Sequence, residues 1–558
     1  MKNKSNFLIH SAILLFFLLF FALVYKPLIK GHYLYGDDYL RIWTYPWEAN
    51  TTQSYISYSQ LMMPEGRPLT ILYELLIFNK YINSLKSYEA ANIVRIFGII
   101  GVGLLAYVLY VIFKANKFRT DHAFLLSILI CTLPSFQVYL GWLICLVSIY
   151  SVLLSASSFL VMFKAVFKED GLKKANVVIA VPISIILFVA SLCIYQPTAM
   201  TYWSFALIPL IMIKNEGFVK KWRLPFLIYF SSGFISMLLY FNIIKIFNML
   251  LHIKFQDRGT LIHGIANIYH RLIWFIKYPL YNSINLWNIY PKEVMLFVSM
   301  GIFAGILFVL GRMVLQAIVR KELNPLLNLL CRYLLILVII PLSYMAHLAT
   351  MGSAATYNKG MVYVLEFRTL AALQIVVLLL FYWGIMNTSE FFKNLLNLSA
   401  DLQNKIVTIG LVILTVLVSL LANHNVDKYF AKQHTNEYRY AYDIIRKYGV
   451  SKLSNGSKIY VKPAISSRLK GGGEVHLMYG EFYHRDPPSP MIQLALYELG
   501  IRSDISIVEI YNYDPKTGAP IEKHDKRYQR FPDDENILKI DMTKMSVKET
   551  YPLIYYDD

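Results

Sequence analysis

The sequence predicts a polytopic α-helical membrane protein with a small soluble α/β domain at its C-terminal end. Hydrophobic residues make up 56% of the 558 residues and charged residues only 16%, whereas soluble globular proteins carry roughly a quarter charged residues. The mean hydropathy is +0.47, and the apolar residues gather in runs long enough to cross a bilayer. After about residue 422 the sequence becomes polar and rich in charge.

Eleven runs have about the 20 mostly apolar residues that a membrane-crossing helix needs. They lie near residues 6–26, 92–113, 122–140, 142–166, 176–195, 198–213, 224–247, 293–318, 331–350, 369–387 and 405–423. The first run is longer than the core of a signal peptide and lacks a small-residue cleavage site, so we expect it to be a retained helix. Short spans are easily miscounted, and a miscount by one or two remains an alternative.

Lysine and arginine follow the even-numbered spans. They occupy the connectors near 114–119, 168–174, 214–223, 320–321 and 393. Because cytoplasmic connectors carry such an excess, this pattern predicts a cytoplasmic N-terminus and a C-terminal domain on the opposite side. The basic residues form no single patch, so the net charge of +19 does not indicate nucleic-acid binding.

The chain therefore divides into a transmembrane domain at 1–422 and a soluble α/β domain at 423–558. Three long outer loops are expected near 26–92, 248–292 and 351–368. In the C-terminal domain, helices are expected at 437–449 and 490–500, and strands at 457–462 and 504–513, from the apolar periodicity and the Pro and Gly signals at their ends.

The first outer loop begins with "GHYLYGDDYLRIW". Asp37 and Asp38 lie just beyond the first span, and a helix here would bring Arg41 onto the face of Asp37. A carboxylate at this place can accept a proton from a hydroxyl, and an arginine beside it can bind a phosphate. The set suits group transfer from a phosphate-bearing lipid to a hydroxyl. An interfacial ion pair that anchors the helix end is the alternative.

Two further sets of residues lie in the outer loops. "EGRPL" in the first loop supplies Glu65 and Arg67, either as phosphate or sugar ligands or as a plain turn. Lys359, Glu366 and Arg368 precede the tenth span, where Arg368 can reach a lipid headgroup or simply extend to the interface.

The second outer loop is interpreted as a solvated amphipathic segment. Its histidine and charged residues are His252, Asp257, Arg258, His263, His270 and Arg271. They show no metal-ligand spacing, and no compact carboxylate cluster exists beyond Asp37 and Asp38, so no metal is expected. No phosphate-binding glycine loop stands in a usable context, so no nucleotide cofactor is expected. The four cysteines lie in or beside apolar runs and are interpreted as buried free thiols.

The many spans and the acidic motif after the first span resemble the GT-C class of membrane glycosyltransferases. "YGDDYLRIW" followed by "EGRPL" is most similar to the bacterial serotype-converting O-antigen glucosyltransferases, which are often phage-encoded. The motif match covers about 35 residues, Tyr35 to Leu69, while the architectural similarity covers the whole chain.

The resemblance implies a site and a reaction. One acidic residue would be the general base on the acceptor hydroxyl, with Asp37 favoured and Asp38 binding a sugar, and Arg41 and Arg67 would help to hold the substrates. The donor would be undecaprenyl-phosphate glucose and the acceptor a sugar of the lipid-linked O-antigen (lipopolysaccharide). Direct displacement would invert the anomeric centre. The protein would act at the periplasmic face of the inner membrane, and its C-terminal domain would contact the polysaccharide.

Two other functions remain open at this stage. A flippase or transporter of lipid-linked sugars would need charged residues along a path through its spans, and the spans carry few. An O-antigen polymerase or ligase would share the many spans but would not need an acidic pair directly after the first one.

Overall fold

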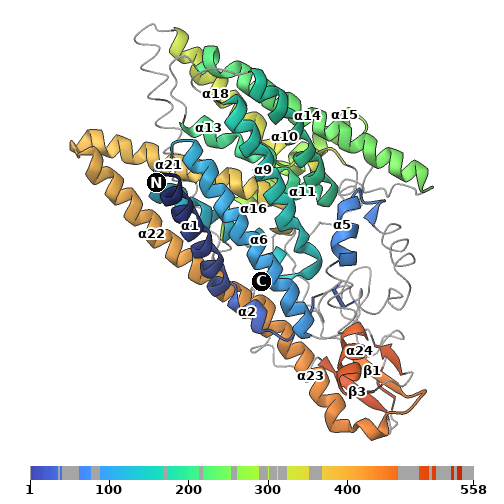
Figure 1. Cartoon of the computed structure of the whole chain (residues 1–558). Helices are drawn as coiled ribbons and strands as arrows, with labels where there is room; N and C mark the ends of the chain where they lie inside the picture. The colour runs from blue at the N-terminus through green and yellow to red at the C-terminus, as the bar shows by residue number, and fades with distance from the viewer. Residues whose placement is uncertain are drawn as a thin grey trace.

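A bundle of long apolar helices leads into a small parallel sheet (Figure 1). This computed structural model describes residues 2–35, 38–39, 62–76, 88–167, 174–212, 218–252, 261–287, 300, 311, 323–350, 367–462, 489–501, 505–510, 530–532 and 537–542. The first half contains α1 (Lys2–Val24), α2 (Lys26–Lys30), α5 (Pro68–Tyr73), α6 (Tyr88–Ala115), α7 (Thr120–Cys131), α8 (Pro134–Gly141), α9 (Val147–Val166), α10 (Lys174–Ile194), α11 (Gln196–Ala199), α12 (Thr201–Phe205) and α13 (Leu207–Met212). The second half contains α14 (Phe218–Leu250), α15 (Ile265–Phe275), α16 (Tyr281–Ser283), α18 (Leu323–Leu342), α19 (Met345–Leu348), α21 (Ala371–Leu396), α22 (Ala400–Asn425), α23 (Gln433–Tyr448), β1 (Lys458–Lys462), α24 (Ser489–Glu498), β2 (Ser506–Glu509) and β3 (Leu538–Asp541).

Seven helices in the described part of the chain are long and apolar enough to cross a membrane, and a bent pair would make an eighth. They coincide with the predicted spans at 6–26, 92–113, 142–166, 176–195, 224–247, 369–387 and 405–423. The bent pair, α7 and α8, corresponds to 122–140 and turns by 53° at Pro134, which begins α8. The protein is thus a helical membrane protein, as its sequence predicts.

The total of eleven spans stays a prediction. The run at 198–213 is divided among α11, α12 and α13, all short and almost wholly buried. The run at 331–350 overlaps only a shorter apolar helix, Leu330–Leu342. The run at 293–318 lies, except for two residues, outside the described ranges.

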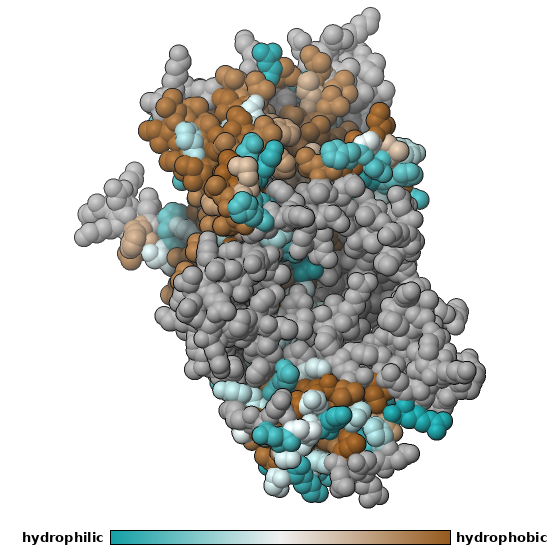
Figure 2. All heavy atoms as spheres, turned by 90° about the vertical axis from the view of Figure 1, so that its right-hand side faces the viewer, coloured by the Kyte–Doolittle hydropathy of each residue, from teal (hydrophilic) through white to brown (hydrophobic). Residues whose placement is uncertain are grey.

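The helices α6, α9 and α21 form the interior, while α1, α14 and α22 expose apolar faces. Figure 2 shows apolar side chains gathered over the helical half of the molecule, whereas the end with the sheet mixes polar and apolar residues. Interior helices approach closely through small polar residues: Ser151 and Ser155 of α9 both hydrogen-bond Ser191 of α10, at 2.9 and 2.8 Å. Small residues and hydroxyl pairs of this kind are typical of helix contacts in membranes.

The C-terminal sheet is parallel, in the order β2-β1-β3. Its first two strands and the helices α23 and α24 occur where the sequence predicts them, and β3 is an addition. A π-helical segment, Val426–Lys432, joins α22 to α23, so that one helical run extends from Ala400 to Tyr448 and reaches the sheet (Figure 1). The domain boundary expected at residue 423 falls inside this run.

The bundle has two ends, which we name by their contents. The loop end carries residues 31–35, 38–39, 62–76, 142–146, 195–196, 341–350 and 367–370, together with the sheet. The network end carries residues 114–122 and 400–408. The positive-inside pattern predicts that the loop end faces away from the cytoplasm, and this orientation stays a prediction.

Candidate functional site

Asp38 is fully buried at the loop end. Its Oδ1 accepts a hydrogen bond from the backbone N–H of Ile144 at 3.1 Å. Its Oδ2 accepts bonds from the N–H groups of Leu143 and Tyr35, both at 3.2 Å. Leu143 and Ile144 open the 3-10 turn that leads into α9, so the carboxylate lies where free N–H groups favour an anion. It fastens the acidic loop to the start of α9.

Burial raises the pKa of Asp38 to about 7, against the opposing effects of Arg95 and the three backbone N–H groups. Arg95 is itself buried. Its guanidinium lies 3.9 Å from the ring centre of Tyr33 and donates to the carbonyl of Tyr33 at 2.8 Å. Asp38 therefore has the geometry of a positioning residue, and its predicted contact with a sugar stays a prediction. Asp37 and Arg41 lie outside the described residues.

The second motif forms a tight turn at the same end. Arg67 pairs with Glu65 at 2.7 Å, and its guanidinium lies 4.6 Å from the ring centre of Tyr195. Gly66 has a φ of +74°, which glycine adopts without strain. The side-chain amide of Gln196 donates to the Gly66 carbonyl at 2.7 Å. The turn is thus fixed to the start of α11, and Arg67 is directed against an aromatic ring.

Three arginines from separate segments of the chain lie close enough to His347 in α19 for their charges to act on it. Burial lowers the pKa of His347 to about 3, and the positive charges of Arg271, Arg368 and Arg67 lower it further. The imidazole is therefore neutral at physiological pH. Its Nε2 is buried and has no hydrogen-bond partner. We call these four residues the arginine cluster.

Aromatic rings also hold the other two arginines of the arginine cluster in place. The guanidinium of Arg368 lies 4.4 Å from the ring centre of Trp142, and that of Arg271 lies 4.7 Å from the ring centre of Trp274. Arg271 also donates to the carbonyl of Thr350 at 2.7 Å. Stacked arginines lose less freedom on binding a ligand, because their planar forks are already oriented.

The turn at Trp142–Cys145 connects Asp38 with the arginine cluster. Asp38 binds the backbone of this turn, as described above, while the Nη1 of Arg368 donates to the Sγ of Cys145 at 3.7 Å. Tyr35 packs edge-on against Trp142, with ring centres 4.9 Å apart. The acidic loop and the cluster therefore share one turn and form a single candidate site.

The described members of the predicted site do come together at one end of the bundle. They are Asp38, Glu65, Arg67 and Arg368. Asp37, Arg41, Lys359 and Glu366 lie outside the described residues, so their predicted roles are untested. The interpretation of the second outer loop as solvated is wrong for Arg271, which is buried because it packs on Trp274. His263 and His270 are exposed, as expected.

The sequence contains no indication of a role for His347, and from it we expect Arg271 in a solvated loop. Both lie in short helices, α19 and α15, whose partners are distant in sequence. A signal was present in α15: Arg271 stands three residues before Trp274, on the face opposite the exposed Ile265 and Tyr269.

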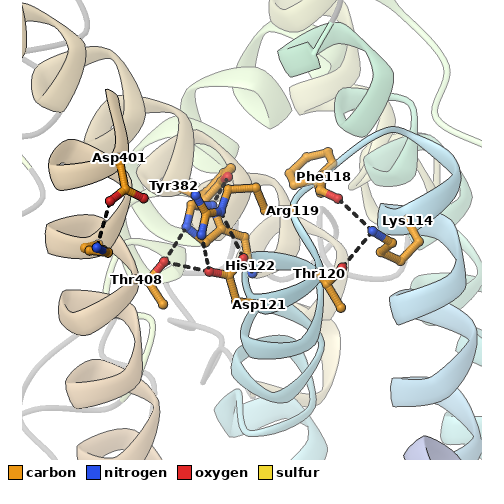
Figure 3. A network of polar contacts seen from close by, with 10 residues as sticks. Lys114, Phe118, Arg119, Thr120, Asp121, His122, Tyr382, Asp401 and Thr408 are labelled. Atoms are coloured by element: carbon orange, nitrogen blue, oxygen red, sulfur yellow. Dashed lines mark hydrogen bonds and ion pairs between the residues drawn. The ribbon is translucent and has the colours of Figure 1, made fainter. Parts of the chain in front are cut away.

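A second polar group lies at the network end (Figure 3). Asp121 accepts hydrogen bonds from the guanidinium of Arg119 at 2.9 Å and from the hydroxyl of Thr408 at 2.8 Å. His122 contacts the hydroxyl groups of Tyr382 and Thr408 at 2.9 and 3.1 Å. These contacts join α7, α21 and α22, and every group has a partner, which is typical of a structural clamp.

Among the residues that the structure describes, no three His, Cys, Asp or Glu side chains lie close enough together to hold a metal ion. The four cysteines are free, and three of them are buried. Comparisons with protein-family models, with curated proteins and with solved structures give no match to this chain. What the chain does is therefore inferred from the chemistry of its site.

Proposed function

We propose that this chain is an inverting membrane glycosyltransferase. It would move glucose from undecaprenyl-phosphate glucose to a hydroxyl of lipid-linked O-antigen, at the periplasmic face of the bacterial inner membrane. The observation that carries the proposal is the convergence of Arg67, Arg271 and Arg368 on the neutral His347, beside the turn that Asp38 holds.

The arginine cluster suits a phosphate attached to a lipid. A guanidinium fork can bind two phosphate oxygens at once, and several arginines together offset the charge of a phosphodiester and of the phosphate that leaves. The cluster lies at the ends of apolar helices, where basic side chains meet lipid headgroups. His347 adds a neutral polar group without further positive charge.

The acidic loop supplies the proton acceptor in this proposal. Asp37 takes the proton of the acceptor hydroxyl as that oxygen attacks the anomeric carbon of glucose. The bond between this carbon and the phosphate oxygen breaks, and undecaprenyl phosphate leaves with its charge against the arginines. Attack opposite the leaving group inverts the anomeric centre. The fully buried Asp38 keeps the loop against α9.

The flippase alternative calls for charged groups along a path through the bundle. Two buried arginines lie inside long described helices, Arg95 and Arg332. Each faces an aromatic ring and donates to a backbone carbonyl, for Arg332 that of Ile211 at 3.0 Å. These contacts favour a structural use for both arginines and so favour the enzyme.

A transfer assay tests the proposal. Membranes that contain the protein are given labelled undecaprenyl-phosphate glucose and lipid-linked O-antigen, for the wild type and for Arg271→Ala and Arg368→Ala. Loss of one charge-assisted phosphate contact should raise the donor KM about 10- to 100-fold. Arg439→Ala is the matched control, because this exposed arginine of α23 lies outside the arginine cluster.

Three results would contradict the proposal. One is the absence of glucosylated product, with labelled lipid crossing the bilayer instead, which would favour the flippase. Another is polymer growth or ligation without glucose transfer. The third is an unchanged donor KM in both arginine variants.

A further inference from the structure

A buried pair of ionisable residues lies in the first two turns of α23. His434 and Glu437 have no exposed side-chain surface, and the Nδ1 of His434 is 3.3 Å from the Oε2 of Glu437. Burying such groups costs desolvation free energy that their mutual attraction often fails to recover. The pair lies at the junction between the helical bundle and the C-terminal sheet, far along the chain from the acidic loop.

The fold brings this pair against the acidic loop. The ring of His434 stacks on Tyr33 with ring centres 5.9 Å apart and meets Tyr35 edge-on at 5.0 Å. Tyr35 is the residue whose N–H donates to Asp38. Beside the pair, the hydroxyl of Thr435 accepts a bond from the N–H of His32 at 3.2 Å. The start of α23 therefore contacts the loop from His32 to Tyr35.

The junction leaves little room for movement. A Cβ added at Gly141 would lie 1.9 Å from a ring carbon of Phe430, and one added at Gly31 would lie 3.2 Å from the Cβ of Ala431. The Tyr33 hydroxyl donates to the Gly141 carbonyl at 3.3 Å. Packed interiors transmit displacement, so a shift of α23 would also move the loop.

A second series of contacts runs from α24, through α23, to the same loop. The Tyr438 hydroxyl of α23 donates to Glu498 of α24, and its ring lies 4.7 Å from that of Tyr88. The hydroxyl groups of Tyr88 and Tyr39 are 3.3 Å apart. Tyr39 follows Asp38 directly, so the loop is braced by α23 on both sides of the acidic pair.

We propose that His434 and Glu437 are positioning residues for the acidic loop. They hold Tyr33 and Tyr35, and thereby the backbone that carries the proton acceptor, in the orientation that the transfer step requires. For its chemistry this inference rests on the proposed function. It makes the segment after α22 part of the transfer site itself, in addition to any contact with the polysaccharide.

Two measurements on the full-length protein in detergent test the proposal. Hydrogen–deuterium exchange follows the backbone amides of residues 31–39, and steady-state kinetics with labelled undecaprenyl-phosphate glucose gives kcat and KM. In His434→Ala, exchange in this segment should rise about tenfold. The kcat should fall about 10- to 100-fold, while the donor KM changes less than about twofold, because the arginine cluster binds the phosphate elsewhere.

Control variants separate positioning from general loss of structure. His424→Ala replaces an exposed histidine of the same helical run and should change neither measurement. His434→Phe with Glu437→Gln restores a ring against the tyrosines and replaces the buried acid that faces His434 by a neutral amide, so it should recover most of the lost kcat. A single variant, His434→Phe, should recover less, because the buried Glu437 then faces an apolar ring in place of His434.

The outcomes decide between the two proposals. Unchanged exchange in residues 31–39, exchange that rises equally in α9, or a raised KM with an unchanged kcat would each overturn the positioning role. A wild type that transfers no sugar would overturn the proposed function. The exchange measurement would then decide alone whether α23 positions the loop.

Discussion

Replacing Asp38 by asparagine removes one buried charge and keeps the shape of the side chain. The two carboxylate oxygens accept three N–H bonds, one on Oδ1 and two on Oδ2. Asparagine has only one side-chain oxygen, and its amide nitrogen cannot accept a hydrogen bond. The amide nitrogen therefore faces either the N–H of Ile144 or those of Leu143 and Tyr35, and at least one of the three bonds is lost. At a pH below 7 the folded carboxyl is protonated and neutral, so the lost bond costs about 0.5–1.5 kcal/mol.

The difference in stability between the wild type and Asp38→Asn depends on pH. Burial raises the pKa of Asp38 from 3.8 to about 7, so between these values the folded protein holds a proton that the unfolded chain releases. The stability contributed by Asp38 is therefore fully present below about pH 4 and is lost as the pH rises through 7. The loss amounts to about 4 kcal/mol. Asparagine does not ionise and has no such dependence.

Denaturant titrations in detergent at pH 4 and pH 8 measure both effects. At pH 4 the variant should be about 0.5–1.5 kcal/mol less stable than the wild type. At pH 8 the difference should have moved by about 4 kcal/mol in favour of the variant. A variant that loses further stability relative to the wild type as the pH rises would refute this reasoning. It would mean that the backbone N–H groups and Arg95 outweigh burial.

Three further predictions concern the candidate site. Arg368→Lys keeps the charge but loses the stacking on Trp142 and the bidentate binding geometry of the guanidinium. The donor KM should therefore rise about tenfold at unchanged kcat. A lower kcat at unchanged KM would argue against phosphate binding. Gly66→Ala places a Cβ 2.3 Å from a tyrosine hydroxyl of α14 at a φ of +74°. The control is Gly456→Ala, where φ is also positive but the space is open. In thermal unfolding, Gly66→Ala should lower the free energy of unfolding by about 1–3 kcal/mol more than the control does, and equal losses would contradict the tight turn. Because the pKa of His347 is about 3, the pH–rate profile between pH 5 and 8 should keep its shape in His347→Gln, and an inflection near neutral pH that vanishes in the variant would disprove its neutrality.

The sequence predicts much of the architecture and half of the site. Runs of about 20 apolar residues identify the long helices, because a bilayer requires that length. Asp38, Arg67 and Arg368 could be expected at one end, because each follows or precedes a span on the same predicted side. Their spacing along the chain says nothing about the turn at Trp142–Cys145, where the structure brings Asp38 and Arg368 together.

The features that escape prediction depend on distant contacts. The run at 198–213 has the composition of a span but is divided into three short helices, buried among neighbours that satisfy its backbone. The polar shift near residue 423 suggests a boundary, yet α22 continues into α23, since a change in polarity does not end a helix. His347 carries no local signal, because its neutral state comes from burial and from arginines in three other segments.

The initial rate of glucose transfer by Asp37→Asn, at saturating labelled donor and with Asp38→Asn beside it, tests the central claim most directly. Loss of the general base should lower the rate of Asp37→Asn about 10²- to 10⁴-fold, with the donor still bound. Asp38→Asn, which loosens the loop but leaves Asp37 in place, should retain more activity than Asp37→Asn. A rate within tenfold of the wild type in Asp37→Asn would show that the proton acceptor lies elsewhere.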